Sequence, residues 1–243
     1  EAKMTTWWPY LRIAAALLAA AAIVAQLIRT LQIARAATTE WGAHLPTVVA
    51  NFFSFFTIES NVAAVVALAC GGIWALRRRD TTTPEPRWLA ILLMCTSTYM
   101  IVTGVVYNLL LRGIELPQGS TVGWSNEVLH VVIPIIMLAD VLFAPRRRAL
   151  GWNAVGIAAI FPIVWVIYTL IRANLVIAPA SGATWWYPYP FLDPHQDGGY
   201  VAVGLYVLLI AAIIIGAAAL VVWVGRRRAV VSDSLVDAAI ADA

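Results

Sequence analysis

The sequence predicts an all-α polytopic membrane protein with six transmembrane helices and both termini in the cytoplasm. Of its 243 residues, 62% are hydrophobic and only 12% are charged, with a mean hydropathy of +0.83. Soluble domains carry about a quarter charged residues, so this composition indicates an integral membrane protein. Six apolar segments each approach or exceed the ~20 residues that span the hydrocarbon layer. Three arginine triplets fall on one side of the topology that these segments define.

We expect each apolar segment to be a helix, because lipid cannot satisfy the polar groups of an open backbone. The six segments are residues 8–31, 46–76, 88–111, 125–144, 152–171 and 200–224. They divide the chain into an N-terminal segment (1–7), a six-helix domain (8–225) and a cytoplasmic tail (226–243). We interpret the three residues before Met4 as an addition to the natural sequence. The Gly71-Gly72 pair and the many alanines favour close helix packing.

The basic residues set the predicted orientation. Arginine triplets follow the second, fourth and sixth segments, at residues 77–79, 146–148 and 226–228. The opposite side of the topology carries only isolated arginines, so the positive-inside rule places the triplets and both termini in the cytoplasm. The net charge of +3 is then a topology signal, and we expect no nucleic-acid partner. We predict a multi-pass protein of the cell (plasma) membrane, the inner membrane if the source is bacterial.

The predicted third external loop, residues 173–199, differs from the short basic loops on the other side. It contains the run Trp-Trp-Tyr-Pro-Tyr-Pro-Phe-Leu, which ends at Leu192. Because its prolines exclude a helix and its aromatic rings would be costly in water, we expect it to fold back over the bundle. A lid over a lipid site and an interfacial belt are both open interpretations. His195 between Asp193 and Asp197 supports a metal site only weakly, and we expect no metal and no other cofactor.

The second apolar segment holds polar groups that are expensive at membrane depth. Residues 51–61 read Asn-Phe-Phe-Ser-Phe-Phe-Thr-Ile-Glu-Ser-Asn, and such groups in lipid call for a partner or a function. In a continuous helix, Ser54, Thr57 and Asn61 share a face through their i, i+3 and i+7 spacing. Glu59 then points elsewhere, either paired with a cation or protonated.

Counting along each helix at ~1.5 Å per residue gives the depth of the polar groups. Thr57 lies 20 residues before Arg77, about 30 Å, and His130 lies 16 residues before Arg146, about 24 Å. Five other polar residues come out at similar depth: Asn61, Thr103, Tyr107, Tyr168 and Tyr206. The sequence therefore predicts one polar layer in the outer half of the bilayer.

The fourth segment supplies a possible partner for Thr57. Asn126, Glu127 and His130 share a helical face, so Asn126 or Glu127 can hold one ring nitrogen of His130. We expect Pro134 to bend this helix and open a cavity beside His130. Although a membrane threonine is most often a helix–helix hydrogen bonder, a membrane histidine is functional about as often as structural. Our hypothesis is that Thr57 is a nucleophile working with His130.

Taken together, these motifs resemble a known family. The sequence resembles the androgen-induced (FAR-17a-like) family in its six spans and in three motifs. These are Phe-Thr-Ile-Glu-Ser-Asn in the second span, Asn-Glu-Val-Leu-His before Pro134 in the fourth, and Trp-Tyr-Pro-Tyr-Pro-Phe-Leu in the last external loop. The resemblance extends from the first span to the sixth. It implies hydrolysis, since animal members are described as membrane threonine hydrolases that cleave fatty acid esters of hydroxy fatty acids. Their threonine and histidine match Thr57 and His130.

The implied reaction is acyl transfer to Thr57, with His130 as general base and a lipid from the bilayer as substrate. Asn61, Tyr107 or Asn108 is expected to donate to the oxyanion, a contribution of about 3 kcal/mol. Further residues are expected to support the substrate or the site: Ser54, Asn126, Glu127, Tyr187 and Tyr206.

Two other functions stay open. A small-solute or ion transporter or channel would use the same polar layer, but the sequence shows no internal repeat and no interrupted helix pair of the kind such sites use. A non-catalytic lipid-binding membrane protein would use Thr57 and His130 only as hydrogen-bonding groups.

Overall fold

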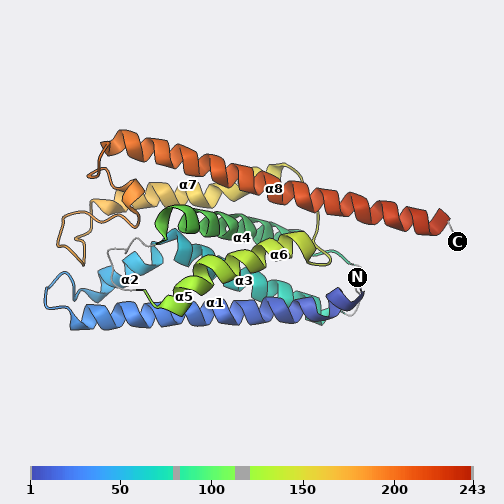
Figure 1. Cartoon of the computed structure of the whole chain (residues 1–243), viewed down its shortest axis with the longest axis horizontal. Coiled ribbons are helices and arrows are strands. Elements are labelled where there is room, and N and C mark those ends of the chain that lie inside the picture. The colour runs from blue at the N-terminus through green and yellow to red at the C-terminus, as the bar shows by residue number, and fades with distance from the viewer. Residues whose placement is uncertain (1, 79–82, 113–120, 242–243) are drawn as a thin grey trace.

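The computed structural model describes residues 2–78, 83–112 and 121–241, and in these ranges it is an all-helical bundle (Figure 1). Six of the described helices are long and apolar enough to cross a membrane, which confirms the predicted fold class. The main helices are α1 (Ala2–Ala36), α3 (Phe56–Arg77), α4 (Arg87–Val106), α6 (Ile133–Phe143), α7 (Asn153–Ala173) and α8 (Gly199–Ala241). The short ones are α2 (Leu45–Phe53), α5 (Gly123–Glu127), the π-helical turns η1 (Tyr107–Leu111) and η2 (Val128–Val132), and the 3₁₀ turn η3 (Pro190–Leu192). The third span continues α4 to Leu111, and the fourth runs from Gly123 to Phe143, so it includes α6 and the two short elements before it.

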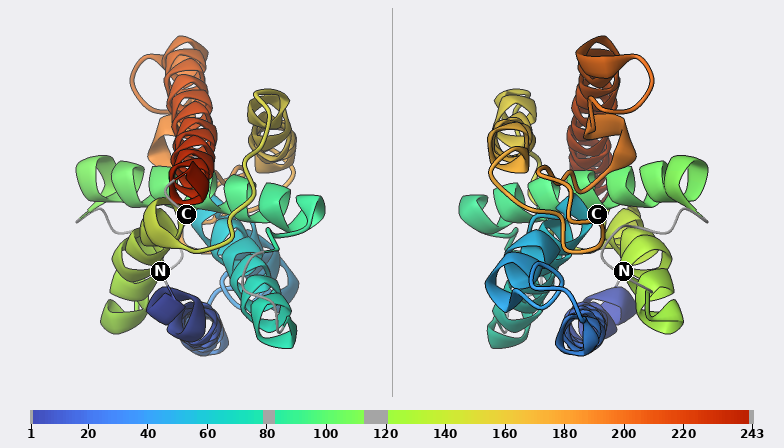
Figure 2. Two further views of the ribbon diagram at one scale, coloured as in Figure 1. Left: turned by 90° about the vertical axis from the view of Figure 1, so that its right-hand side faces the viewer. Right: turned by 90° about the vertical axis from the view of Figure 1, so that its left-hand side faces the viewer.

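Helix α4 occupies the centre of the bundle. It has α1, α3 and α6 on one side and α7 and α8 on the other (Figures 1 and 2). Its side chains Leu89, Leu93 and Met100 are completely buried, and the Tyr99 hydroxyl donates to the Ala158 carbonyl of α7 over 2.9 Å. Burial on both sides explains why this span is the most enclosed of the six.

Both termini lie at one end of the bundle (Figure 1). We call this the arginine-rich end, because Arg77, Arg147 and Arg227 mark it on three different helices or loops. Helix α8 continues past these arginines to Ala241, so the predicted tail, residues 226–243, is helical as far as the structure describes it.

Small residues bring α1 and α3 together, as the sequence predicts. A Cβ added at Gly71 would lie 2.9 Å from Arg12, and one added at Gly72 would lie 2.9 Å from the Pro9 carbonyl. The facing alanines of α1, such as Ala19, are buried. Side chains larger than glycine would therefore push the two helices apart.

The second span is interrupted, and the prediction of one continuous helix over residues 46–76 is wrong. Helix α2 ends at Phe53, and Phe55 has extended backbone with ψ of 125° before α3 begins. The Ser54 hydroxyl donates to the Ala50 carbonyl over 2.7 Å, and the Ser54 carbonyl accepts a bond of 3.0 Å from the Trp165 indole of α7. Side chains thus satisfy the backbone at the break, as membrane depth requires.

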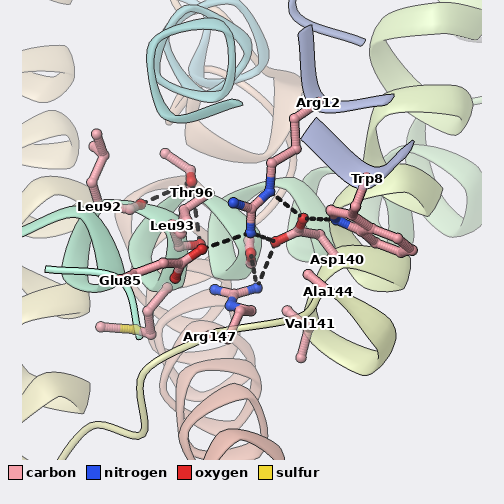
Figure 3. A network of polar contacts seen from close by, with 12 residues as sticks. Trp8, Arg12, Glu85, Leu92, Leu93, Thr96, Asp140, Val141, Ala144 and Arg147 are labelled. Atoms are coloured by element: carbon pink, nitrogen blue, oxygen red, sulfur yellow. Dashed lines mark hydrogen bonds and ion pairs between the residues drawn. The ribbon is translucent and has the colours of Figure 1, made fainter. Parts of the chain in front are cut away.

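A buried network of charges joins three segments at the arginine-rich end (Figure 3). The Arg12 guanidinium pairs with Asp140 at 2.7 Å and with Glu85 at 2.8 Å, and Asp140 also pairs with Arg147 at 3.1 Å. The indole of Trp8 donates to Asp140 as well, over 2.7 Å. Two cations and two anions balance, so each buried charge has a partner. Sequence reasoning does not predict the pairing of Arg12 with Glu85 and Asp140, because these residues are far apart in the chain.

Removing one partner from this network leaves buried charges uncompensated. We expect Asp140→Ala to lower the free energy of unfolding by about 3–5 kcal/mol, measured by unfolding in detergent micelles. The matched control is Glu127→Ala, which breaks the half-exposed ion pair with Arg112 and should cost at most about 1 kcal/mol. Equal losses in the two variants would contradict a structural role for the network.

Candidate functional site

A cavity of about 130 Å³ lies between α3, α4, α7, α8 and the loop that precedes α8. Its polar side chains are Thr57, Thr103, Tyr107 and Tyr189, apart from the indole of Trp165. The remaining lining residues are aliphatic, phenylalanine or proline. Such a wall suits a hydrocarbon chain with one reactive or polar group, and it lacks the charged ligands that an ion requires.

Thr57 occupies the first turn of α3, directly after the break in the second span. Its backbone N–H donates to the Tyr189 hydroxyl over 3.3 Å, and its own hydroxyl oxygen lies 3.4 Å from the same group. Burial raises the pKa of Tyr189 above its ordinary value, so the phenol keeps its proton at neutral pH. Since Tyr189 accepts from the Thr57 amide, its proton is free to be donated to Thr57 Oγ1 or to a ligand.

His130 has a defined tautomer. Its Nδ1 lies 2.9 Å from the backbone carbonyl of Asn126, and because a carbonyl only accepts, Nδ1 must carry the proton. Nε2 therefore keeps the lone pair that a general base needs. The sequence predicts Asn126 or Glu127 for this role; the structure assigns it to the main chain of Asn126.

The ring of Tyr107 stacks on His130, with centroids 3.8 Å apart, and the Asn126 amide donates to the Tyr107 hydroxyl. Tyr107 lines the cavity, whereas His130 does not, so the phenol ring stands between them. Within the described residues, no hydrogen bond joins His130 to Thr57. The structure thus brings the two predicted catalytic residues to the same region without direct contact.

Asn61 connects the two regions. Its amide nitrogen donates to the Thr57 carbonyl over 2.9 Å and to the Leu129 carbonyl over 3.2 Å, next to His130 in the chain. The start of α3 and the π-helical turn η2 are therefore held side by side by one completely buried side chain. Because both amide protons are engaged, Asn61 is not free to donate to an oxyanion, and that expectation is wrong.

Asn108 is engaged in the same way. Its amide nitrogen donates to the Gly104 carbonyl over 2.8 Å and to the His130 carbonyl over 3.3 Å, while its oxygen accepts from Arg112. Pro134 has no N–H for the His130 carbonyl, which lies four residues earlier, and Asn108 supplies the missing donor. Asn108 therefore supports the backbone at His130 and is also not free for an oxyanion.

Pro134 packs against Gly104, where an added Cβ would lie 2.8 Å from the proline ring. The cavity expected beside His130 stays a prediction. The helical irregularity in this region takes the form of π-helical turns, η2 around His130 and η1 around Tyr107. Such turns are rare and frequently lie at functional sites. In the sequence, Pro134 is their one visible signal.

The other predicted supporting residues lie outside the cavity wall. Ser54 bonds the Tyr168 hydroxyl at 3.0 Å and belongs to the break, so it shares no helical face with Thr57. Glu127 pairs with Arg112 at the surface. The Tyr187 hydroxyl lies 3.5 Å from the Asn174 amide. Tyr206, 42% exposed, packs near the ring of Phe191.

Glu59 is the acidic residue of the second span. In the described residues, Glu59 forms no ion pair, and its Oε2 is buried without a hydrogen-bond partner.

The loop before α8 holds a pair of titratable side chains. Asp193 lies 2.8 Å from the His195 ring within the loop. No group of three or more potential metal ligands gathers in the described parts of the chain. The loop pair therefore orders the loop, and nothing in its geometry indicates a metal.

The aromatic loop folds back onto the bundle, as predicted. Trp186, Tyr189 and Leu192 are buried, and Tyr189 and Leu192 line the cavity together with Phe191. The ring of Phe55, at the helix break, packs edge-on against both Trp186 and Tyr189. The loop thus forms a wall of the cavity rather than a belt that faces lipid.

The link through Asn61 can be tested by stability. We expect Asn61→Ala to lower the free energy of unfolding by about 1–3 kcal/mol, because it removes two hydrogen bonds and buried volume. Asn108→Ala removes two carbonyl bonds of the same kind, and the bond from Arg112, at an exposed position, and should cost less than about 1 kcal/mol. Unfolding of both variants in the same detergent makes the comparison, and a larger loss for Asn108→Ala would refute the assignment.

Comparisons of the chain with protein-family models, with curated proteins and with solved structures find no match.

Proposed function

We propose that the protein is an intramembrane lipid ester hydrolase that cleaves fatty-acid esters with Thr57 as nucleophile and His130 as base. The observation that carries the proposal is the position of Thr57 in the wall of a mostly apolar, uncharged cavity. A hydroxyl beside an acyl-chain cavity is the arrangement that attack on a lipid ester needs. The resemblance to the androgen-induced family adds the substrate class, fatty acid esters of hydroxy fatty acids.

The proposed reaction has two steps. Thr57 Oγ1 attacks the ester carbonyl and its proton passes to Nε2 of His130, which returns it to the departing alcohol; an acyl-threonine is left. Water then gives a proton to His130 and attacks the acyl group, the acyl–oxygen bond to Thr57 breaks, and His130 returns the proton to Thr57 Oγ1 as the fatty acid leaves. The tautomer held by the Asn126 carbonyl leaves Nε2 available for both transfers.

Tyr107 must move for this reaction, because its ring stands between His130 and the cavity. Contacts between catalytic groups are often long before substrate binds and shorten in the complex. We propose that an acyl chain displaces the Tyr107 ring, which brings Nε2 of His130 within reach of Thr57.

Two features of the site suit an oxyanion. The first N–H groups of α3 have no helical partners, and the first intrahelical bond of this turn is donated by Glu59 to the Phe55 carbonyl. The positive end of the helix dipole thus lies at Thr57. The buried, protonated phenol of Tyr189 lies at the same point. In the proposal, Tyr189 takes the role that sequence reasoning assigns to Asn61 or Asn108.

The interrupted second span gives the transporter alternative one observation in its favour. Broken helices bind solutes in many transporters, and the sequence argument against such a role relies on an unbroken span. The cavity beside the break is lined by apolar and hydroxyl groups without a charge, which favours an apolar ligand over an ion. A non-catalytic lipid-binding protein would share this cavity, so turnover has to decide between them.

Substitution of Thr57 tests the proposal directly. In purified protein in nanodiscs, we expect Thr57→Ala and His130→Gln to abolish hydrolysis of branched and simple fatty-acid esters and labelling by a fluorophosphonate probe. Thr57→Ser keeps the nucleophile and should retain activity. Thr103→Ala, which removes another hydroxyl from the same cavity, is the matched control and should retain activity as well. Unchanged turnover in folded Thr57→Ala protein would exclude the mechanism.

Tyr189 is tested separately. We expect Tyr189→Phe to lower kcat on the order of 10²-fold with little change in KM, because an oxyanion donor acts in the transition state. Tyr187→Phe removes a phenol of the same loop that contacts Asn174 instead of Thr57, and its kcat should stay near that of the wild type. Similar losses of kcat in both variants would indicate that the substitutions disturb the loop, and that the Tyr189 hydroxyl has no specific role in the transition state.

A further inference from the structure

A second cavity, of about 200 Å³, lies at the arginine-rich end of the bundle between the beginnings of α4 and α7. Its polar side chains are Arg87, Arg148 and Asn153. It shares no residue with the cavity at Thr57 and plays no part in the proposed hydrolysis. We infer that this cavity binds the phosphate headgroup of an anionic phospholipid.

The two arginines supply the charge. The Nε of Arg148 donates to the Glu85 carbonyl over 2.6 Å, which fixes the side chain while its terminal nitrogens stay available. Within the described ranges, those nitrogens and the guanidinium of Arg87 have no hydrogen-bond or ion-pair partner. No acidic side chain lines the cavity in the described part of the chain, and Glu85 nearby is already paired with Arg12. The two arginines therefore give the cavity a positive charge that no described acidic side chain of its wall offsets.

Backbone groups add to this charge. Helix α4 begins at Arg87 and α7 at Asn153, so two helices of 20 and 21 residues start at the same cavity. The positive end of a helix dipole favours a phosphate, and the first N–H groups of α4 lie before its first intrahelical bond, from Ala90 to the Pro86 carbonyl. In α7 the N–H groups of Ala154 and Val155 bond the Gly151 and Trp152 carbonyls, so this helix contributes mainly its dipole. Figure 2, left, shows the loop between α6 and α7, which carries Arg148, crossing this end of the bundle.

The position of the cavity favours a lipid over a free phosphate ion. Trp88 and Trp152, beside the two helix starts, are 57% and 52% exposed, as expected of indoles at the level of lipid headgroups. Ile91 of α4 and Ile157 of α7 continue the cavity wall one turn deeper into the bundle. A phosphodiester at the arginines would thus have its acyl chains along these apolar side chains. Basic pockets between helices at the cytoplasmic surface are a common form of headgroup site.

The experiment compares lipid binding by the full chain in detergent micelles that contain phosphatidylglycerol or phosphatidylcholine, read by native mass spectrometry. We expect the wild type to retain phosphatidylglycerol preferentially. Arg87→Gln with Arg148→Gln should weaken its Kd on the order of tenfold. The matched control, Arg77→Gln with Arg78→Gln, removes two exposed arginines from the same end of the bundle and should leave the Kd nearly unchanged. The single variant Arg87→Gln keeps the Arg148 contact with Glu85 and replaces the double variant if that does not fold.

Two results would overturn the inference. An equal loss of phosphatidylglycerol in both double variants would mean that general charge, and not this cavity, attracts the lipid. A third arm adds inorganic phosphate to protein in phosphatidylcholine micelles. If phosphate raises the melting temperature as much as phosphatidylglycerol does, and only when Arg87 and Arg148 are present, the site binds the free ion and the lipid assignment is wrong.

Discussion

The requirement that polar groups inside a bilayer find partners within the protein governs this structure, most plainly at the break in the second span. The backbone at the break cannot stay open to lipid, and the indole of Trp165 on α7 donates to the Ser54 carbonyl, while the hydroxyl of Tyr168 bonds the Ser54 side chain. The break in turn lets α3 begin anew at membrane depth, which places Thr57 at a helix N-terminus. A continuous helix would give Thr57 neither the dipole nor the contact with Tyr189.

The two ends of the bundle meet this requirement differently. At the arginine-rich end, Arg12, Glu85, Asp140 and Arg147 neutralise one another in a closed network, which ties α1 and α6 to the segments that precede α4 and follow α6 (Figure 3). At the other end, the helices meet through π-helical turns, single asparagines and an aromatic loop. Such irregular contacts rearrange at lower cost than buried ion pairs do. The site therefore lies where the bundle is easiest to deform.

The sequence predicts the spans well because hydropathy depends on composition alone, and it also places Thr57, Tyr107 and His130 in one region. It fails where a local pattern is overruled by a partner from elsewhere in the chain. The face shared by Ser54 and Thr57 presupposes a regular helix, which the capping by Trp165 replaces. Asn61 and Asn108 are plausible donors until their carbonyl partners are known. Tyr189 is 132 residues from Thr57, and no spacing rule connects two such positions.

The contact between Tyr189 and Thr57 joins an interhelical loop to the first turn of α3. The loop that carries Tyr189 connects α7 to α8 and is not itself a membrane span, yet it forms one wall of the cavity. A molecule that binds or cleaves this loop would therefore reshape the cavity at Thr57 without entering between the helices.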